Sequence, residues 1–331
     1  MENKVRDSQF DNIRGLMILS VVYVHTISKL CHGWLKDPVV CQLYYFLVLF
    51  PIPVLAFMSG YFSKRKTDFA PYMTKALATC IIPYFVFQLL HSIPAKEKML
   101  NLLNPAWTLW FMLALFLWKI MAEIFLRVKY GLIVAFAFSL YAGCIVMIGN
   151  YLALSRTICF FPFFLAGVIC QKEGIERLRN VNKFLAVGGM VLVVLISWYI
   201  FSQNLGYRTM FFNNSYKSLK QRRLQGIGLR ALVLTGGFLC ILFFVAIVTR
   251  KKTFLAMLGQ NSITIYLGHS LILVYAKKIG FLQNFRNPVL FLPIGLAVAL
   301  AICFLLGNKY VAMGYNWLFG KLGRLLLVQD G

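Results

Sequence analysis

The feature that most constrains this chain is a series of ten apolar stretches of roughly 20 residues, with most of the charged residues between them. A helix rises about 1.5 Å per residue, so each stretch can cross a hydrocarbon core of about 30 Å, although the sixth is short. The stretches lie near residues 13–30, 41–62, 72–92, 107–126, 131–148, 156–171, 184–201, 229–249, 256–276 and 288–306. The sequence therefore predicts an all-α polytopic membrane protein, a bundle of about ten transmembrane helices that forms one integral-membrane domain over residues 1–331.

The composition excludes other classes of protein. Hydrophobic residues make up 60% of the chain and charged residues 13%, about half the charged share of a soluble domain. A transmembrane β-barrel would show alternating segments of about ten residues instead of unbroken runs. The formal net charge of +24 does not indicate a nucleic-acid partner, because the basic residues belong to the loops between the spans. Membrane lipids are the expected surroundings.

The distribution of Lys and Arg predicts the orientation. An even number of spans puts both termini on one side, and the bias favours the cytosol for both. The exception is the basic loop 202–228, which is long enough to cross the membrane whatever its charge, and which meets either an anionic glycan or anionic lipid headgroups. Trp34, Trp107 and Trp317 are expected to be anchors at the membrane interface.

Ionisable residues deep in a bilayer are costly, so those inside the spans are the candidates for function. All the acidic residues lie outside the spans or at their ends, which argues against ion-coupled transport. The first span contains Arg14 and His25, eleven positions apart. Eleven steps of 100° make three turns plus 20°, so the two side chains share a helix face and are separated by about 16 Å along it.

This spacing suits an acyl group carried on an extended pantetheine arm. The guanidinium of Arg14 stays charged and can hold phosphates at the inner mouth, and the imidazole of His25 can transfer a proton near neutral pH. Two structural alternatives stay open: Arg14 as an ordinary membrane anchor held by Asp11, and His25 as a buried histidine bonded to a backbone carbonyl. Lys75 and Arg156 either hold CoA phosphates or acceptor anions, or extend towards the headgroups.

A second histidine, His269, lies in the ninth apolar stretch. If that span enters from the cytosol between Phe254 and Ser262, His269 reaches a depth of about 10 to 22 Å, which overlaps that of His25. We therefore expect two imidazoles to meet. Either His269 or a backbone carbonyl would fix the tautomer of His25, the alternative being a structural role for His269.

Six segments in order along the chain resemble a known family. They are Phe10-Asp11-Asn12-Ile13-Arg14-Gly15-Leu16 with His25, Phe57-Met58-Ser59-Gly60-Tyr61-Phe62, Lys75 with Pro83-Tyr84, Trp107-Thr108-Leu109-Trp110-Phe111, Arg156 with Phe161-Pro162-Phe163-Phe164-Leu165-Ala166-Gly167, and Gly259-Gln260-Asn261-Ser262 through Tyr266 to His269. Together they resemble the membrane acyltransferase 3 family, in particular its fucose 4-O-acetylase-like or O-antigen acetylase-like branch.

The resemblance implies a ten-helix enzyme of the bacterial cytoplasmic membrane that takes an acetyl group from cytosolic acetyl-CoA. It would pass this group to a hydroxyl of a cell-envelope polysaccharide or lipid-linked sugar on the outer side. His25 would be the catalytic base or acyl carrier, with Arg14 at the acyl-CoA mouth and no metal. One departure is that many relatives carry a glutamate in the fourth span, where Met112 and its neighbours are apolar here. No carboxylate from that helix can therefore orient His25.

Two other functions fit a helical bundle. One is a transporter or facilitator of a small solute or lipid-linked glycan, and the other is a non-catalytic partner of a polysaccharide synthase. Within the enzyme hypothesis, the sequence leaves open the acceptor, the choice between acetyl and succinyl, and the choice between direct transfer and an acyl-enzyme relay.

Overall fold

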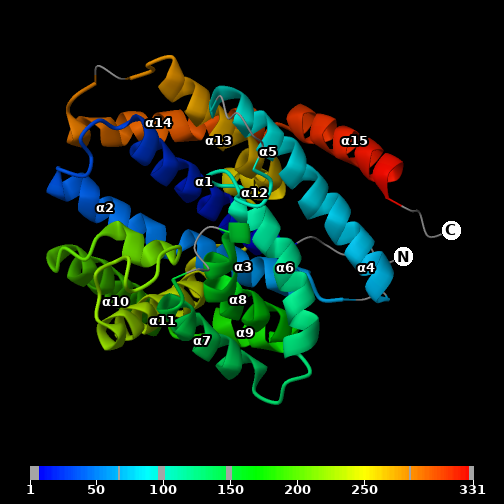
Figure 1. The fold of residues 1–331 in the computed structure, drawn as a ribbon, viewed down its shortest axis with the longest axis horizontal. Helices are drawn as coiled ribbons and strands as arrows, with labels where there is room; N and C mark the ends of the chain where they lie inside the picture. Colours follow the sequence, from blue (N-terminus) through cyan, green and yellow to red (C-terminus); the bar gives the residue numbers. More distant parts are fainter. Residues whose placement is uncertain (1–6, 66–67, 96–100, 147–150, 283–284, 328–331) are drawn as a thin grey trace.

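The computed structural model describes residues 7–65, 68–95, 101–146, 151–282 and 285–327, and over these residues the chain is helical without a strand (Figure 1). The predicted all-α class is confirmed, and each of the ten apolar stretches is mainly helical where it is described. The helices are α1 (Ser8–Leu30), α2 (Pro38–Leu49), α3 (Pro51–Phe62), α4 (Phe69–Ala76), η1 (Leu77–Ile81), α5 (Ile82–Ala95), α6 (Trp110–Phe125), α7 (Gly131–Tyr141), η2 (Ala142–Cys144), η3 (Tyr151–Ala153), α8 (Leu154–Ile169), α9 (Lys172–Arg179), α10 (Lys183–Ser202), η4 (Tyr207–Phe211), α11 (Arg223–Ile247), α12 (Phe254–Gln260), α13 (Ser262–Lys278), α14 (Pro288–Leu306) and α15 (Lys309–Leu326).

Seven of the helical segments in the described ranges are long and apolar enough to cross a membrane: Ser8–Leu30, Pro38–Phe62, Phe69–Ile93, Tyr151–Ile169, Lys183–Ser202, Arg223–Ile247 and Pro288–Leu306. The remaining three predicted spans form shorter helices, because α6 has 16 residues, α13 has 17, and the segment Gly131–Cys144 is shorter still. Two of these helices are shorter than the predicted spans because α6 begins only at Trp110 and because Asn261 separates α12 from α13. The count of ten therefore stays a prediction.

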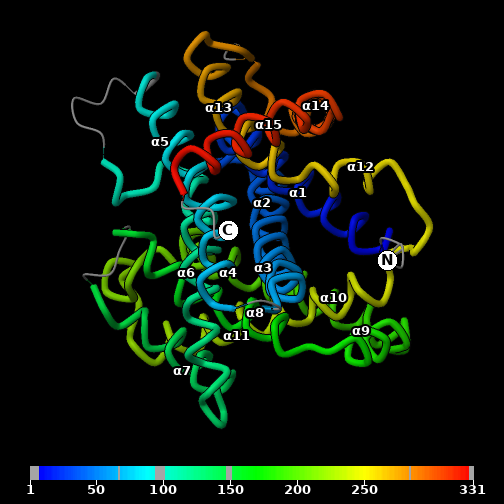
Figure 2. The backbone as a smooth tube through the Cα atoms, turned by 90° about the vertical axis from the view of Figure 1, so that its right-hand side faces the viewer, coloured from blue at the N-terminus to red at the C-terminus, as the bar shows by residue number. Residues whose placement is uncertain are grey.

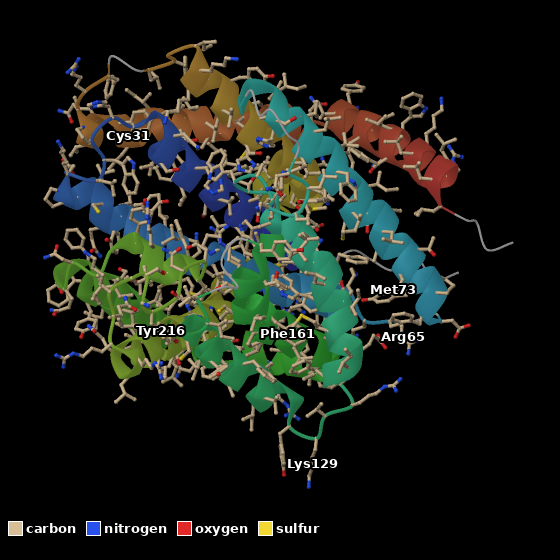
Figure 3. The ribbon with its side chains drawn as sticks, viewed as in Figure 1. Cys31, Arg65, Met73, Lys129, Phe161 and Tyr216 are labelled. Atoms are coloured by element: carbon tan, nitrogen blue, oxygen red, sulfur yellow. The ribbon has the colours of Figure 1, made fainter. Side chains whose placement is uncertain are left out.

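Figures 1 and 2 show how the helices are layered. Helices α5, α13, α14 and α15 gather on one side, α7, α9 and α11 on the opposite side, and α1 lies between them with α2 and α3. Helix α1 packs against α12, α13 and α14, while α3 packs against α8. Cys31, which follows α1, and Arg65, which follows α3, lie at opposite ends of the molecule (Figure 3). Helix α1 therefore runs through the centre of the bundle.

Two pairs of glycines let helix backbones touch. A Cβ on Gly60 of α3 would lie 2.0 Å from the carbonyl oxygen of Phe164, and one on Gly167 of α8 would lie 2.0 Å from that of Phe57. On the other side of the bundle, a Cβ on Gly15 of α1 would lie 1.9 Å from a carbonyl oxygen of α12, and a Cβ on Gly259 would lie equally close to a carbonyl oxygen of α1. Small residues favour such close packing in membranes, where apolar burial alone does not drive helices together.

The start of α1 also binds the loop that leads into α12. The side-chain amide of Asn12 donates hydrogen bonds to the carbonyl oxygens of Thr249 (3.0 Å) and Lys251 (2.7 Å), and its oxygen accepts one from the Thr253 hydroxyl (2.7 Å). Asn12 is fully buried, so these bonds satisfy groups that water cannot reach. Asn12 and the Gly15–Gly259 contact together fix the position of α12, and hence the start of α13, against α1.

We predict that Gly60→Ala lowers the thermal stability of the purified protein, because even one methyl group would collide with the backbone of α8. The matched control is Gly188→Ala in α10, where no atom lies within 4 Å of the added Cβ. There the substitution should leave the melting temperature unchanged or raise it, since alanine favours a helix over glycine by about 1 kcal/mol. Thermal unfolding in the same detergent compares them, and equal melting temperatures would contradict the close contact.

Candidate functional site

Two histidines from distant parts of the chain meet in the centre of the bundle. His25 on α1 and His269 on α13 lie with Nδ1 of His25 2.9 Å from Nε2 of His269. The rings are nearly parallel, with their centroids 5.2 Å apart. His269 is fully buried. The meeting expected from the depths of the two spans is present, and the catalytic role of either residue remains a prediction.

The hydrogen bonds of His269 assign a tautomer to both rings. Nδ1 of His269 lies 3.0 Å from the carbonyl oxygen of Ile265, which can only accept, so Nδ1 carries the hydrogen. No salt bridge among the described residues involves either histidine, and an unpaired buried charge is costly, so we assign both rings as neutral. Nε2 of His269 is then an acceptor, and Nδ1 of His25 donates to it. This leaves Nε2 of His25 with a free lone pair.

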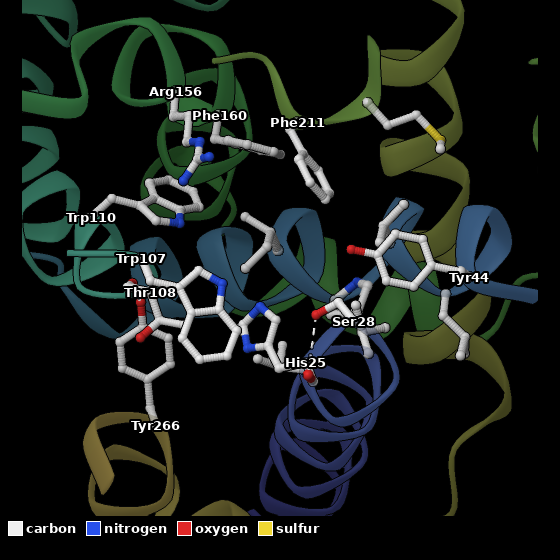
Figure 4. Close-up of a pocket in the computed structure, with 17 residues that line it drawn as sticks. His25, Ser28, Tyr44, Trp107, Thr108, Trp110, Arg156, Phe160, Phe211 and Tyr266 are labelled. Atoms are coloured by element: carbon white, nitrogen blue, oxygen red, sulfur yellow. Dashed lines mark hydrogen bonds between the residues drawn. The ribbon is translucent and has the colours of Figure 1, made fainter. Parts of the chain in front are cut away.

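His25 lines a cavity of about 140 Å³ (Figure 4). Cavities of about this volume hold a molecule the size of benzene. The walls come from α1, α2, α3, the segment before α6 and the start of α6, α8, η4 and α13. The side chains labelled in Figure 4 are His25, Ser28, Tyr44, Trp107, Thr108, Trp110, Arg156, Phe160, Phe211 and Tyr266. The cavity therefore offers a small chamber, lined mainly by apolar and aromatic side chains, beside one imidazole.

Arg156 brings a positive charge into this chamber. It lies near the start of α8, and its guanidinium carbon is 5.1 Å from the centre of the Trp110 ring. Its Nε is buried and has no hydrogen-bond partner among the described residues. A buried donor without a partner costs about 1–3 kcal/mol, so its presence at a cavity wall is unusual. The arrangement is suited to an acceptor atom of a bound molecule.

Trp107 forms the wall beside His25. Its ring centroid lies 4.7 Å from that of His25, and the ammonium of Lys29 lies 4.2 Å from the indole on which it packs. The backbone of Trp107 has φ +31°, a left-handed conformation that is costly for a bulky residue. Trp107 thus packs within the protein, and so does Trp34, which is 8% exposed and packs against Tyr44. Their place relative to the membrane interface stays a prediction.

The two other predicted basic residues do not line this cavity. Arg14 shares the α1 face with His25, as predicted, but its guanidinium packs 4.5 Å from the ring of Phe62, the last residue of α3. The cavity is lined by the first residues of α3. Arg14 is not among the residues that line the cavity. A route for the acyl donor from Arg14 to His25 stays a prediction. Lys75 is exposed on α4. The structure brings together His25, His269 and Arg156, and not Arg14 or Lys75.

Three parts of the site could not be placed beside His25 from the sequence. Trp107 carries no signal in its own residue type, because tryptophan is common at membrane interfaces. The contributions of η4 and Tyr44 depend on how segments from different parts of the chain pack, and the loop that holds η4 stands out in the sequence only for its charge. Arg156 does carry a signal, as a basic residue in an apolar stretch, although nothing in the sequence places it beside His25.

Comparison with protein families gives one match. Residues 7–308 match a family model of the acyltransferase 3 type, described as an acyltransferase domain. No curated protein and no solved structure matched the chain. The matched range includes all the helices that line the cavity and extends just past α14.

We predict different effects from removing two arginines inside the bundle, Arg156 and Arg230. Arg156→Met should not lower the free energy of unfolding, because it removes a charge with an unpaired donor. The control is Arg230→Met: Arg230 is 3% exposed and donates to the carbonyl oxygens of Ser139 and Asn214, each at 3.2 Å, and to the Cys159 sulfur. That change should cost about 1–3 kcal/mol. Unfolding in detergent tests the pair, and a comparable loss in both variants would show that Arg156 is structurally bonded.

Proposed function

This chain belongs to the acyltransferase 3 family, whose model it matches over residues 7–308, and we propose on that premise that it is a membrane O-acyltransferase. It would move an acetyl or similar short acyl group from acyl-CoA to a hydroxyl of a cell-surface or lipid-linked carbohydrate. The observation that supports this most directly is the free Nε2 of His25, which belongs to a ring lining a cavity and held at its other nitrogen by His269.

In the proposed reaction, Nε2 of His25 removes the proton from the acceptor hydroxyl as its oxygen attacks the thioester carbonyl carbon. The carbon–sulfur bond then breaks, and the leaving thiolate takes that proton from His25 to become the CoA thiol. When His25 is transiently charged, its Nδ1–H donates to His269, which lowers the cost of the charge. His269 thus plays the orienting part that a carboxylate plays in other triads, and its own Nδ1–H is held by the Ile265 carbonyl.

Arg156 has a role that follows from its unpaired donor. Negative charge builds on the carbonyl oxygen as the tetrahedral intermediate forms, and a fixed donor in a chamber that excludes water stabilises such charge strongly. We propose that the guanidinium of Arg156 supplies this stabilisation. This replaces the expectation that Arg156 holds the phosphates of CoA, since Arg156 lines the His25 chamber while Arg14 packs on Phe62.

The donor would approach from the end of α1 that carries Arg14. We propose that this end faces the cytosol of a bacterium, as the Lys and Arg distribution predicts, and that Arg14 and Lys75 meet the phosphates of acyl-CoA there. The pantetheine arm would then have to pass the buried side chains that lie along α1 between Arg14 and His25, such as Ile18. Incubating membranes with labelled acetyl-CoA and no acceptor separates direct transfer from a relay, since only a relay leaves label on the protein.

We expect His25→Ala to lower the rate of transfer about 10²–10⁴-fold, because it removes the base. The measurement is labelled acyl transfer in membranes, together with mass analysis of envelope glycans. The control is His91→Ala: His91 is also buried, bonds to the Ser270 hydroxyl at 2.9 Å, and does not line the cavity. The His91→Ala variant should transfer the acyl group at the rate of the wild type. Unchanged glycan acylation in the His25→Ala strain would reject the proposed function.

His269 should behave as a positioning residue. His269→Ala should lower kcat and shift the pH profile, because the tautomer of His25 is no longer fixed. His269→Gln, whose side-chain oxygen can still accept from Nδ1 of His25, should recover part of kcat. If alanine and glutamine were equally impaired with an unaltered pH profile, His269 would serve only to fill space.

A further inference from the structure

A second, larger cavity of about 840 Å³ opens at the end of α1 beyond His25. We call it the outer chamber. Its walls come from the last turn of α1, the loop 31–37, the last turn of α13 and the segment before α14. Four of its lining residues are permanently basic: Lys29, Lys36, Lys277 and Arg286. A chamber of this size is in the range that holds a small ligand.

The charge of the outer chamber is unbalanced. Asp37 is the one acid among its described lining residues, and its carboxylate caps α2 by accepting a hydrogen bond from the Val40 amide at 3.0 Å. No salt bridge among the described residues involves the four basic side chains. Like charges gathered in one concave site repel one another and concentrate a positive potential, which an anion would relieve.

The outer chamber adjoins the His25 cavity. Ser28 lines both. Lys29 lies one residue further along α1, and its ammonium does not simply extend towards the headgroups, because it packs on the Trp107 ring, which in turn packs on His25. A group held by Lys29 would therefore sit one indole away from the imidazole.

We propose that the outer chamber binds an anionic group of the acceptor, a phosphate or a carboxylate, so that a hydroxyl of the same molecule reaches His25 past Ser28. This rests on the proposed function, and it names the acceptor class as an anionic glycan or a phosphate-linked sugar. The proposed donor entrance at Arg14, nearer the start of α1, assigns the phosphates of CoA to another place, because the chamber adjoins Cys31, at the end of the molecule opposite Arg65.

A binding experiment without donor tests the chamber directly. The full chain is purified into nanodiscs of phosphatidylcholine, and binding of glucose 1-phosphate is measured by equilibrium dialysis with glucose as the neutral probe. We expect saturable binding of glucose 1-phosphate only, weakened at least tenfold by the double change Lys29→Gln and Lys277→Gln. The control is Lys278→Gln, which alters a neighbouring lysine that does not line the chamber and should leave binding unchanged.

Further arms separate the possible sources of the anion. If nanodiscs that contain phosphatidylglycerol block binding of glucose 1-phosphate, a lipid phosphate occupies the chamber, whereas binding that persists assigns the chamber to the glycan. The double change to arginine, Lys29→Arg and Lys277→Arg, should retain binding and so shows that the loss with glutamine reflects charge. Equal affinity of the wild type and the glutamine variant, or equal binding of glucose and glucose 1-phosphate, would overturn the proposal.

Transfer kinetics separate this inference from the proposed function. In the glutamine variant we expect a raised KM for an anionic acceptor and an unchanged KM for the donor. His25→Ala should lower the rate of transfer and leave glucose 1-phosphate binding intact. Lysine-dependent binding without any transfer in the wild type would reject the enzyme and keep the anion site. Transfer that depends on His25, with an unchanged acceptor KM in the glutamine variant, would reject the anion site and keep the enzyme.

Discussion

The N–H···N hydrogen bond between His25 and His269 is the interaction on which the rest of the site depends. A neutral imidazole has one donor and one acceptor, so a pair is oriented only if a third group fixes one of them. The Ile265 carbonyl, one turn earlier on α13, does this for His269. The direction of donation then runs from His25 to His269 to the helix backbone. An oriented base is obtained without any carboxylate, which suits a site where a buried negative charge would be expensive.

That hydrogen bond requires two helices to hold a fixed relative position. The contact of Gly15 with α12 and of Gly259 with α1 brings the backbones together, and Asn12 fastens the loop before α12. The residues around Arg14 in the first motif therefore have a structural purpose besides any part in donor binding. They place His269, 244 positions away in the sequence, within hydrogen-bonding distance of His25.

Much of this could be predicted from the sequence, where regular periodicity governs. The helical positions follow from apolar length, the shared face of Arg14 and His25 from the 100° step, and the meeting of the two histidines from their depths. What failed depended on packing between distant segments. The turn at Trp107 and the position of Arg156 beside His25 are set by neighbours that no local pattern reveals. The ninth apolar stretch, near 256–276, is divided at Asn261 within the polar run Gly259-Gln260-Asn261-Ser262, so that α13 is shorter than the predicted span.

The indole of Trp107 lines the His25 cavity and is linked to the outer chamber through Lys29, since it packs against both the imidazole of His25 and the ammonium of Lys29. A ligand in one cavity that shifts this ring therefore also changes the shape of the other cavity. Thermodynamic reciprocity then requires that the ligands of the two cavities change each other's affinity by the same factor. A single strained partition would thus make the two binding events cooperative or antagonistic, and would give the substrates a preferred order of arrival.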